Sequence, residues 1–161
     1  MERIHQVGGE HEGLSLDLDE IARQGARRML AEALQAEVRD YIEAARGQRD
    51  EQGRALVVRN GHAREREVLL GAGSVALKAP RINDKRVDEN GKRRRFESVI
   101  LPPYMRRSPK VTEVLPLLYL HGLSSGDFVP ALQEFFGTEA GLSSATIIRL
   151  TEQWQKSERA S

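Results

Sequence analysis

A long stripe of apolar residues near the N-terminus constrains the fold of this chain more than any other feature. From Asp17 onward, apolar positions recur at steps of mostly three and four, which predicts one amphipathic helix over residues 17–47. Such a helix is about 40 Å long. It cannot bury its stripe against itself, so it needs the rest of the chain or a second copy. The stripe comprises Leu18, Ile21, Ala22, Gly25, Met29, Ala33, Leu34, Val38, Tyr41, Ile42 and Ala45. Residues 1–16 contain three glycines that interrupt the pattern, and we expect them to form a flexible leader.

The middle of the chain, residues 54–103, is predicted to be rich in β-structure and in positive charge. Residues 61–110 contain 13 Lys and Arg against 6 Asp and Glu, whereas both flanking segments carry more acid than base. Residues 64–70 and 74–79 have strand-like patterns and are joined by a glycine-bearing turn, which predicts a hairpin. Asn60-Gly61 predicts a turn before it, residues 82–95 a loop, and residues 96–101 a further short strand.

Four consecutive cations in that loop, Lys92, Arg93, Arg94 and Arg95, are the main candidates for binding a polyanion. Each phosphate that a cation neutralises releases counterions, which favours binding to nucleic acid. A charged loop can equally be an ordinary solvated surface. Both interpretations remain open at this point.

Residues 108–158 are predicted to form three helices arranged as a helix-turn-helix DNA-binding domain. Ile147, Leu150 and Trp154 give the third helix its apolar side. Any small three-helix bundle would show the same spacing. If the helix enters the major groove, its base-reading and phosphate-contacting residues are Ser144, Thr146, Arg149 and Gln153. The fold class predicted for the whole chain is α+β and mostly helical, with a long N-terminal helix, a small central β-hairpin or sheet and a C-terminal three-helix bundle.

Several functional classes are excluded by composition. The chain has no cysteine, which excludes disulfides, thiolate metal sites and thiol nucleophiles. The four histidines lie at scattered positions, so we expect no metal site. No apolar run approaches the roughly 18 residues of a membrane span, and the N-terminus has no apolar signal core. We therefore expect a cytoplasmic protein without membrane contact.

Five separated motifs resemble the N-terminal half of mutator-type bacterial insertion-sequence transposases. The resemblance covers about residues 20–158, and it is specific because the motifs occur in the same order and at similar spacing. They are Arg-Asn-Gly-His-Ala-Arg (59–64), Gly-Ser-Val-Ala-Leu-Lys-Ala-Pro-Arg (73–81), Leu-Tyr-Leu-His-Gly-Leu-Ser (118–124), Phe-Gly (136–137) and Leu-Ser-Ser-Ala-Thr-Ile-Ile-Arg-Leu-Thr (142–151).

The resemblance implies a nucleoid-associated protein that binds the terminal inverted repeats of its own mobile element, as double-stranded DNA, and assembles with copies of itself or with full-length transposase. It also implies a following ribonuclease-H-like domain whose Asp, Asp and Glu hold two divalent metals such as Mg²⁺. The first of these acids would lie beyond the segment matching 146–154, and this chain stops at Ser161. We therefore expect no catalytic residue and no cofactor in this chain.

The sequence departs from the family pattern at two places within the matching region. His62 stands where an aromatic residue is common, and residues 125–128 replace a more basic stretch. The predicted function is DNA binding and assembly within a transposase. The alternatives are a stand-alone regulator or dominant-negative partner, and an active enzyme that borrows its catalytic domain from another chain.

Overall fold

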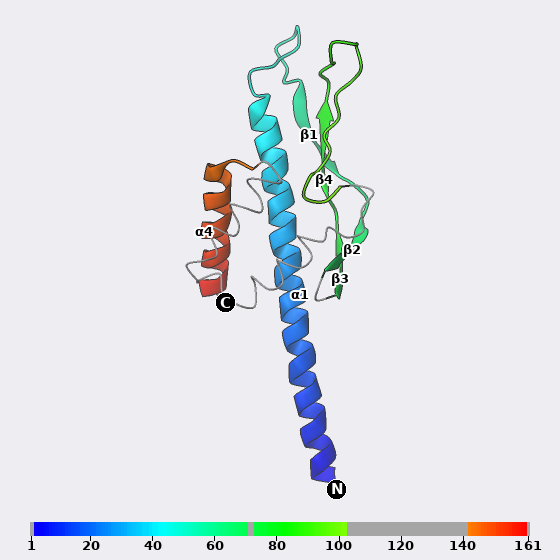
Figure 1. The fold of residues 1–161 in the computed structure, drawn as a ribbon, viewed down its shortest axis with the longest axis vertical. Coiled ribbons are helices and arrows are strands. Elements are labelled where there is room, and N and C mark those ends of the chain that lie inside the picture. Colours follow the sequence, from blue (N-terminus) through cyan, green and yellow to red (C-terminus); the bar gives the residue numbers. More distant parts are fainter. Residues whose placement is uncertain (1, 71–72, 103–141, 161) are drawn as a thin grey trace.

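A single long helix forms the axis of the molecule in the computed structural model, which describes residues 2–70, 73–102 and 142–160. Helix α1 (Glu2–Ala44) has a β-ribbon along one side and helix α4 (Ser144–Ala160) along the other (Figure 1). The ribbon consists of β1 (Val57–His62), β2 (Arg66–Leu70), β3 (Gly73–Leu77) and β4 (Pro80–Asp84).

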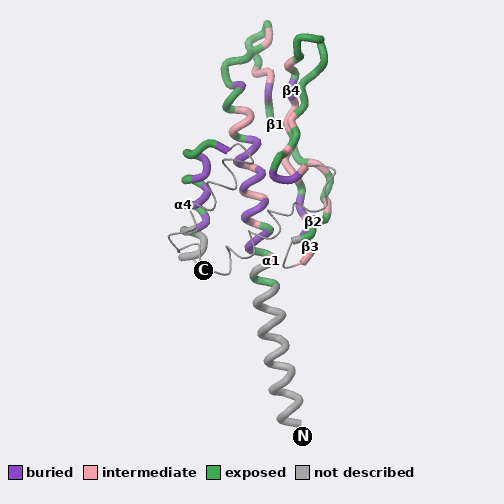
Figure 2. The backbone as a smooth tube through the Cα atoms, viewed as in Figure 1, coloured by how far each residue is buried: buried purple, intermediate pink, exposed green. Residues whose placement is uncertain are grey.

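Helix α1 begins at Glu2, so the prediction of a flexible leader was wrong for residues 2–16. Extending an existing helix is easier than starting one, and an interior glycine costs about 1 kcal/mol relative to alanine without ending the helix. The helix ends at Ala44, close to the predicted end. In the part of α1 whose burial is described, from Glu20 onward, Met29 and Leu30 are fully buried (Figure 2).

The ribbon contains the predicted hairpin and a second, longer-range pair of strands. β2 and β3 are antiparallel neighbours from Arg66↔Leu77 to Leu70↔Gly73, which confirms the hairpin. β1 pairs with β4 in the same antiparallel sense, outside that hairpin. The backbone N–H of Ala63 donates to the carbonyl of Ala79 at 2.8 Å and links the two ladders. Residues 57–70 and 73–84 therefore form one nested ribbon.

Three local predictions for this region were wrong. Asn60-Gly61 lies inside β1 and is no hairpin turn, because the register shifts between Arg59 and His62 and Gly61 takes a positive φ of 61°. A shift of this kind is a β-bulge, which glycine accommodates easily. The predicted loop 82–95 begins later than expected, since β4 continues to Asp84. Residues 96–101 lie beside the ribbon without forming a strand.

The prediction of a C-terminal three-helix bundle was wrong. The described residues contain two helices, α1 and α4, and α4 packs along α1. Trp154 is fully buried and its indole N–H donates to Glu32 of α1. The apolar face of α4 thus packs against the apolar stripe of α1 and helps to bury it. The first two helices expected for the bundle fall within residues 103–141, outside the described residues.

One hydrophobic core joins all these parts. It contains residues from α1, β2, β3, the segment 100–101 and α4. Val68 and Val75 face α1 from the hairpin, and Ile147, Leu150 and Trp154 come from α4. The core therefore holds the hairpin of β2 and β3 against α1. Among the described residues, no helix combines the length and apolarity that crossing a membrane requires.

Candidate nucleic-acid interface

A buried polar cluster fixes the end of β4 to α1. Asp84 is almost fully buried and accepts hydrogen bonds from the Tyr41 hydroxyl at 2.5 Å and from Arg86 Nη2 at 2.9 Å. The guanidinium of Arg86 also lies 5.5 Å from the ring centroid of Tyr41. Burial alone would raise the pKa of the Asp84 carboxyl, but the bonds from Arg86 and Tyr41 outweigh it and hold the pKa at about 2. The carboxylate of Asp84 is therefore ionised and engaged by Tyr41 and Arg86, and it neutralises the charge of Arg86.

A second buried acid, Glu37 of α1, holds the segment that follows the basic run. Its carboxylate accepts bonds from the Ser98 hydroxyl at 2.5 Å and from the backbone N–H groups of Val99 and Ile100 at 2.8 and 3.2 Å. Burial raises the pKa of Glu37, although these three bonds favour its ionised form. Residues 93–101 are therefore anchored at both ends, by Asp84 and by Glu37.

A tight turn over residues 50–54 follows α1 and lies at one end of the molecule. The Asp50 Oδ1 atom accepts the backbone N–H groups of Gln52 at 2.9 Å and of Arg54 at 2.8 Å. Gly53 supplies the positive φ, 79°, that the turn requires. The turn is thus fixed by bonds that one aspartate provides.

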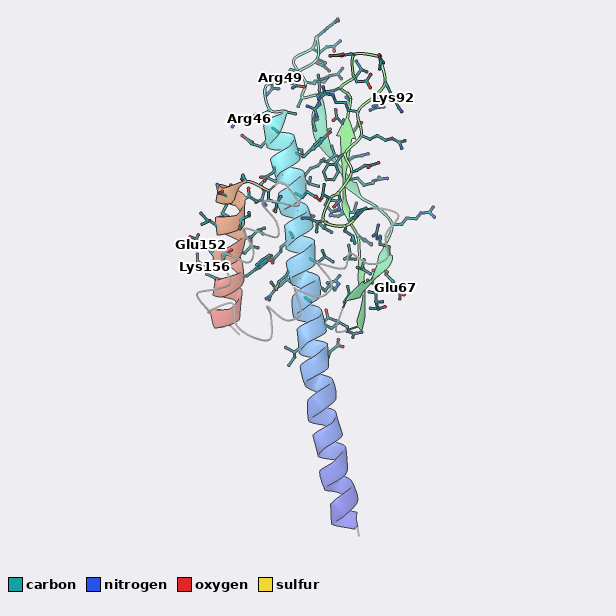
Figure 3. The ribbon with its side chains drawn as sticks, in the orientation of Figure 1. Arg46, Arg49, Glu67, Lys92, Glu152 and Lys156 are labelled. Carbon is teal, nitrogen blue, oxygen red and sulfur yellow. The ribbon has the colours of Figure 1, made fainter. Side chains whose placement is uncertain are left out.

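The same turn recurs over residues 88–92. Asp88 Oδ1 accepts the N–H groups of Asn90 and Lys92, each at 2.9 Å, and Gly91 has φ of 76°. The two turns share the pattern Asp-Glu-Gln/Asn-Gly-Arg/Lys, which the sequence shows and our sequence analysis missed. Arg49, beside the first turn, and Lys92, in the second, lie at the same end of the molecule (Figure 3).

Of the four predicted cations, Arg93 has a structural role. Its Nε donates to the backbone carbonyl of Asp84 at 2.9 Å, and its Nη2 donates to Asn83 Oδ1 at 2.6 Å. A bridge between Val87 and Arg93 closes the loop around the second turn. The side chain of Arg93 is therefore bound by hydrogen bonds to the end of β4.

Lys92, Arg94 and Arg95 are exposed, and no described residue pairs with their side chains. The same holds for two further cations, Lys78 and Lys85, which precede and follow β4. Neither lysine was among the predicted site residues, although both contribute to the positive charge of residues 61–110. Five exposed cations without a described side-chain partner thus lie within one short segment, residues 78–95.

A groove of about 510 Å³ lies between β4 and the anchored segment 93–101. Arg81 of β4 lines one bank, and Arg94 and Arg95 line the other. The remaining described lining residues are Ala63, Arg66, Ala79, Pro80, Ile82, Asn83, Asp84, Arg93, Phe96, Ser98 and Leu101.

The predicted site residues of α4 are separated from this surface. Ser144, Arg149 and Gln153 are exposed on α4, which lies on the opposite side of α1 from the ribbon (Figure 1). Glu152 and Lys156 also point away from α1 (Figure 3). Thr146 is buried, and its hydroxyl donates to Asp40 of α1 at 2.7 Å. Thr146 therefore serves the packing of α4.

Among the residues that the structure describes, no group of acids fits the two divalent metals that the family resemblance implies for a catalytic domain. Within the ranges that the structure describes, no three His, Asp or Glu side chains lie close enough together to hold a metal ion. The carboxylates of Asp84 and Glu37 are poorly suited to bind a metal ion, because each already accepts hydrogen bonds from the protein.

Comparisons with known proteins agree with the motifs. The family described as "Transposase, Mutator family" matches residues 4–160. A stretch of 50 residues is 68% identical to the "Transposase for insertion sequence element IS6120" of Mycolicibacterium smegmatis, and it covers 31% of this chain and 16% of that relative. No solved structure matches the chain. Because the family match extends over almost all of the sequence, the chain belongs to the mutator family of transposases.

Proposed function

We propose that this chain is a DNA-binding and assembly part of a transposase, and that it holds the DNA backbone through the five cations of residues 78–95 without a described side-chain partner, which are Lys78, Lys85, Lys92, Arg94 and Arg95. By family resemblance, the DNA is the terminal inverted repeats of the element. Assembly with further copies or with full-length transposase belongs to the same proposal. A protein that acts on these sites works at the nucleoid, in the bacterial cytoplasm.

One observation carries this proposal: residues 78–95 keep an excess of positive charge after the ion pairs within the protein are taken into account. Residues 78–95 contain eight Lys and Arg and three Asp and Glu. Asp84 is neutralised by Arg86, Asp88 accepts the hydrogen bonds of its turn, and Glu89 is exposed, so the cations still outnumber the acids. Five cations remain without a described partner, and the anchored ribbon holds their backbone in place. Cations held at fixed positions lose less entropy on binding phosphates than cations on a free loop do.

The exposed side of α4 is a second proposed contact, through Ser144, Arg149 and Gln153. Arginine and glutamine are suited to reading guanine and adenine edges, and both side chains are exposed. Glu152 stands beside Arg149 on that side and weakens the attraction to phosphate. We therefore assign most of the non-specific affinity to the ribbon.

A salt titration with matched variants tests the main proposal. Replacing Arg94 and Arg95 by glutamine should flatten the plot of log K against log salt by up to about 1.8, from about 0.9 per phosphate contact. The control variant replaces Arg39 and Arg46, two exposed cations of α1 and of the turn directly after it, which lie outside both proposed contacts. It removes the same charge and should leave the slope nearly unchanged. Equal slopes for wild type and the Arg94/Arg95 variant would refute the proposed contact.

We propose further that the chain alone neither cleaves nor joins DNA, so that it acts as the DNA-holding part of a larger enzyme or as a regulator that occupies the ends. Incubation with end-bearing DNA and Mg²⁺ or Mn²⁺ should give no nicks at the element ends. Reproducible nicking there would contradict this.

A further inference from the structure

We propose that the groove between β4 and residues 93–101 binds single-stranded DNA. This inference rests on the proposed function, since it names a second form of DNA that the same basic segment would accept. Duplex backbone would contact the exposed cations around the groove, and an unpaired strand would enter it.

The size of the groove favours a single strand. Its volume of about 510 Å³ is in the range of roughly 300–1,000 Å³ in which small organic ligands bind. A few unpaired nucleotides fit a space of that kind. A duplex keeps its bases paired and stacked in its interior, so it cannot place them against the lining of the groove, whereas an unpaired strand can.

The lining of the groove has the chemistry that unpaired nucleotides require. Its two banks carry arginines for the phosphates: Arg81 on β4, and Arg94 and Arg95 on the opposite segment. Between them lie apolar side chains and one aromatic ring, Phe96, against which bases can pack. A positively charged groove with an aromatic residue is the general arrangement of single-strand binding sites.

The acid in the groove does not oppose a phosphate. Asp84 is the one acid among the described lining residues, and its side chain is 1% exposed. It is paired with Arg86, and Arg93 bonds to the backbone beside it. The outward charge of the groove is therefore positive.

The banks are held at a fixed separation, so that the groove exists before DNA binds. Arg93 ties the second bank to Asn83 and Asp84 of β4. Further along, Glu37 holds residues 98–100 against α1. Phe96 packs edge-on against Tyr41, with the ring centroids 4.9 Å apart.

Fluorescence anisotropy with two labelled probes tests the inference: a short oligothymidylate and a blunt duplex of the same length, both bound to the full chain. Arg81→Gln should weaken oligothymidylate binding about fivefold at about 0.1 M salt, from a slope of about 0.7 per phosphate contact. Duplex affinity should change less than about twofold, because we place Arg81 outside the duplex contact. Lys92→Gln, outside the groove, should weaken the duplex and spare the single strand.

The variant Arg81→Lys distinguishes the charge of Arg81 from its structural hydrogen bond. It keeps the positive charge but loses the bond that Arg81 Nε donates to the Asn60 carbonyl at 3.3 Å. It should retain single-strand affinity within about twofold. An equal loss in Arg81→Lys and Arg81→Gln would refute the inference, as would equal losses on the two probes. Binding of the duplex but not of oligothymidylate would refute it and leave the proposed function standing. Binding of neither probe would refute both.

Discussion

The pairing of Asp84 makes the stability of the fold depend on acid pH in a way that can be calculated. The carboxyl has an ordinary pKa of 3.8 and a folded pKa of about 2. A depression of about 1.8 units corresponds to about 2.4 kcal/mol of stability, at 1.36 kcal/mol per unit. Because the folded pKa is the lower one, this contribution is fully present above about pH 5 and is lost as the pH falls toward 2. About 2 kcal/mol should disappear between pH 5 and pH 2.

The assay is urea unfolding of wild type and Asp84→Asn, followed by circular dichroism at several pH values. The asparagine variant cannot ionise, so its deficit in unfolding free energy should be largest near neutral pH and should shrink by about 2 kcal/mol at pH 2. Tyr41→Phe removes one of the bonds to the carboxylate and should show a smaller deficit of the same sign. A deficit of Asp84→Asn that stays constant from pH 6 to pH 2 would refute the assigned pairing.

Glu37→Gln provides a control of opposite sign. Burial raises the pKa of Glu37 above its ordinary 4.5, so its protonated form stabilises the fold. That contribution is present below the ordinary pKa and is lost as the pH rises through the folded one. The advantage of wild type over Glu37→Gln should therefore decrease with rising pH, whereas its advantage over Asp84→Asn increases.

Three further predictions concern single positions. Trp154→Ala should destabilise the chain by about 3–5 kcal/mol in urea, because the buried indole joins α4 to α1; a cost below about 1 kcal/mol would argue against that packing. Gly91→Ala should cost about 1–2 kcal/mol because φ is 76°, whereas Gly47→Ala, with ordinary φ and open space, should not destabilise; equal effects on the melting temperature would contradict this. Arg149→Ala should lower affinity for the inverted repeat more than for random DNA; equal losses, measured by anisotropy, would limit Arg149 to phosphate contact.

The parts of the fold that could be predicted from sequence are the local ones. The stripe of α1 and the hairpin of β2 and β3 depend on residues close together in the chain, and their patterns are periodic. The family motifs were also sufficient to identify the family. The leader and the turn at Asn60-Gly61 were mispredicted because glycine was interpreted as a break, whereas the helix and the bulge both tolerate it.

The remaining features depend on partners that are distant in sequence. β1 meets β4 across the whole hairpin, and nothing in either strand alone specifies that register. Thr146 seemed to share an outward face with Arg149, but it lies one turn before the buried Leu150, and its hydroxyl finds an acceptor in Asp40, 106 positions away. Arg93 could not be separated from its neighbours in the basic run, because only the fold shows that it bonds to β4.

The repeated turns at residues 50–54 and 88–92 bear on the order in which the chain folds. Each turn closes a loop of a few residues, so each can form in microseconds before distant segments meet. The ladder between β1 and β4 joins positions as far apart as Val57 and Asp84 and must close a much larger loop. Both turns border that ladder, one before β1 and one after β4. We expect them to start chain compaction from its two outer sides, so that Asp50→Ala and Asp88→Ala slow refolding more than they speed unfolding.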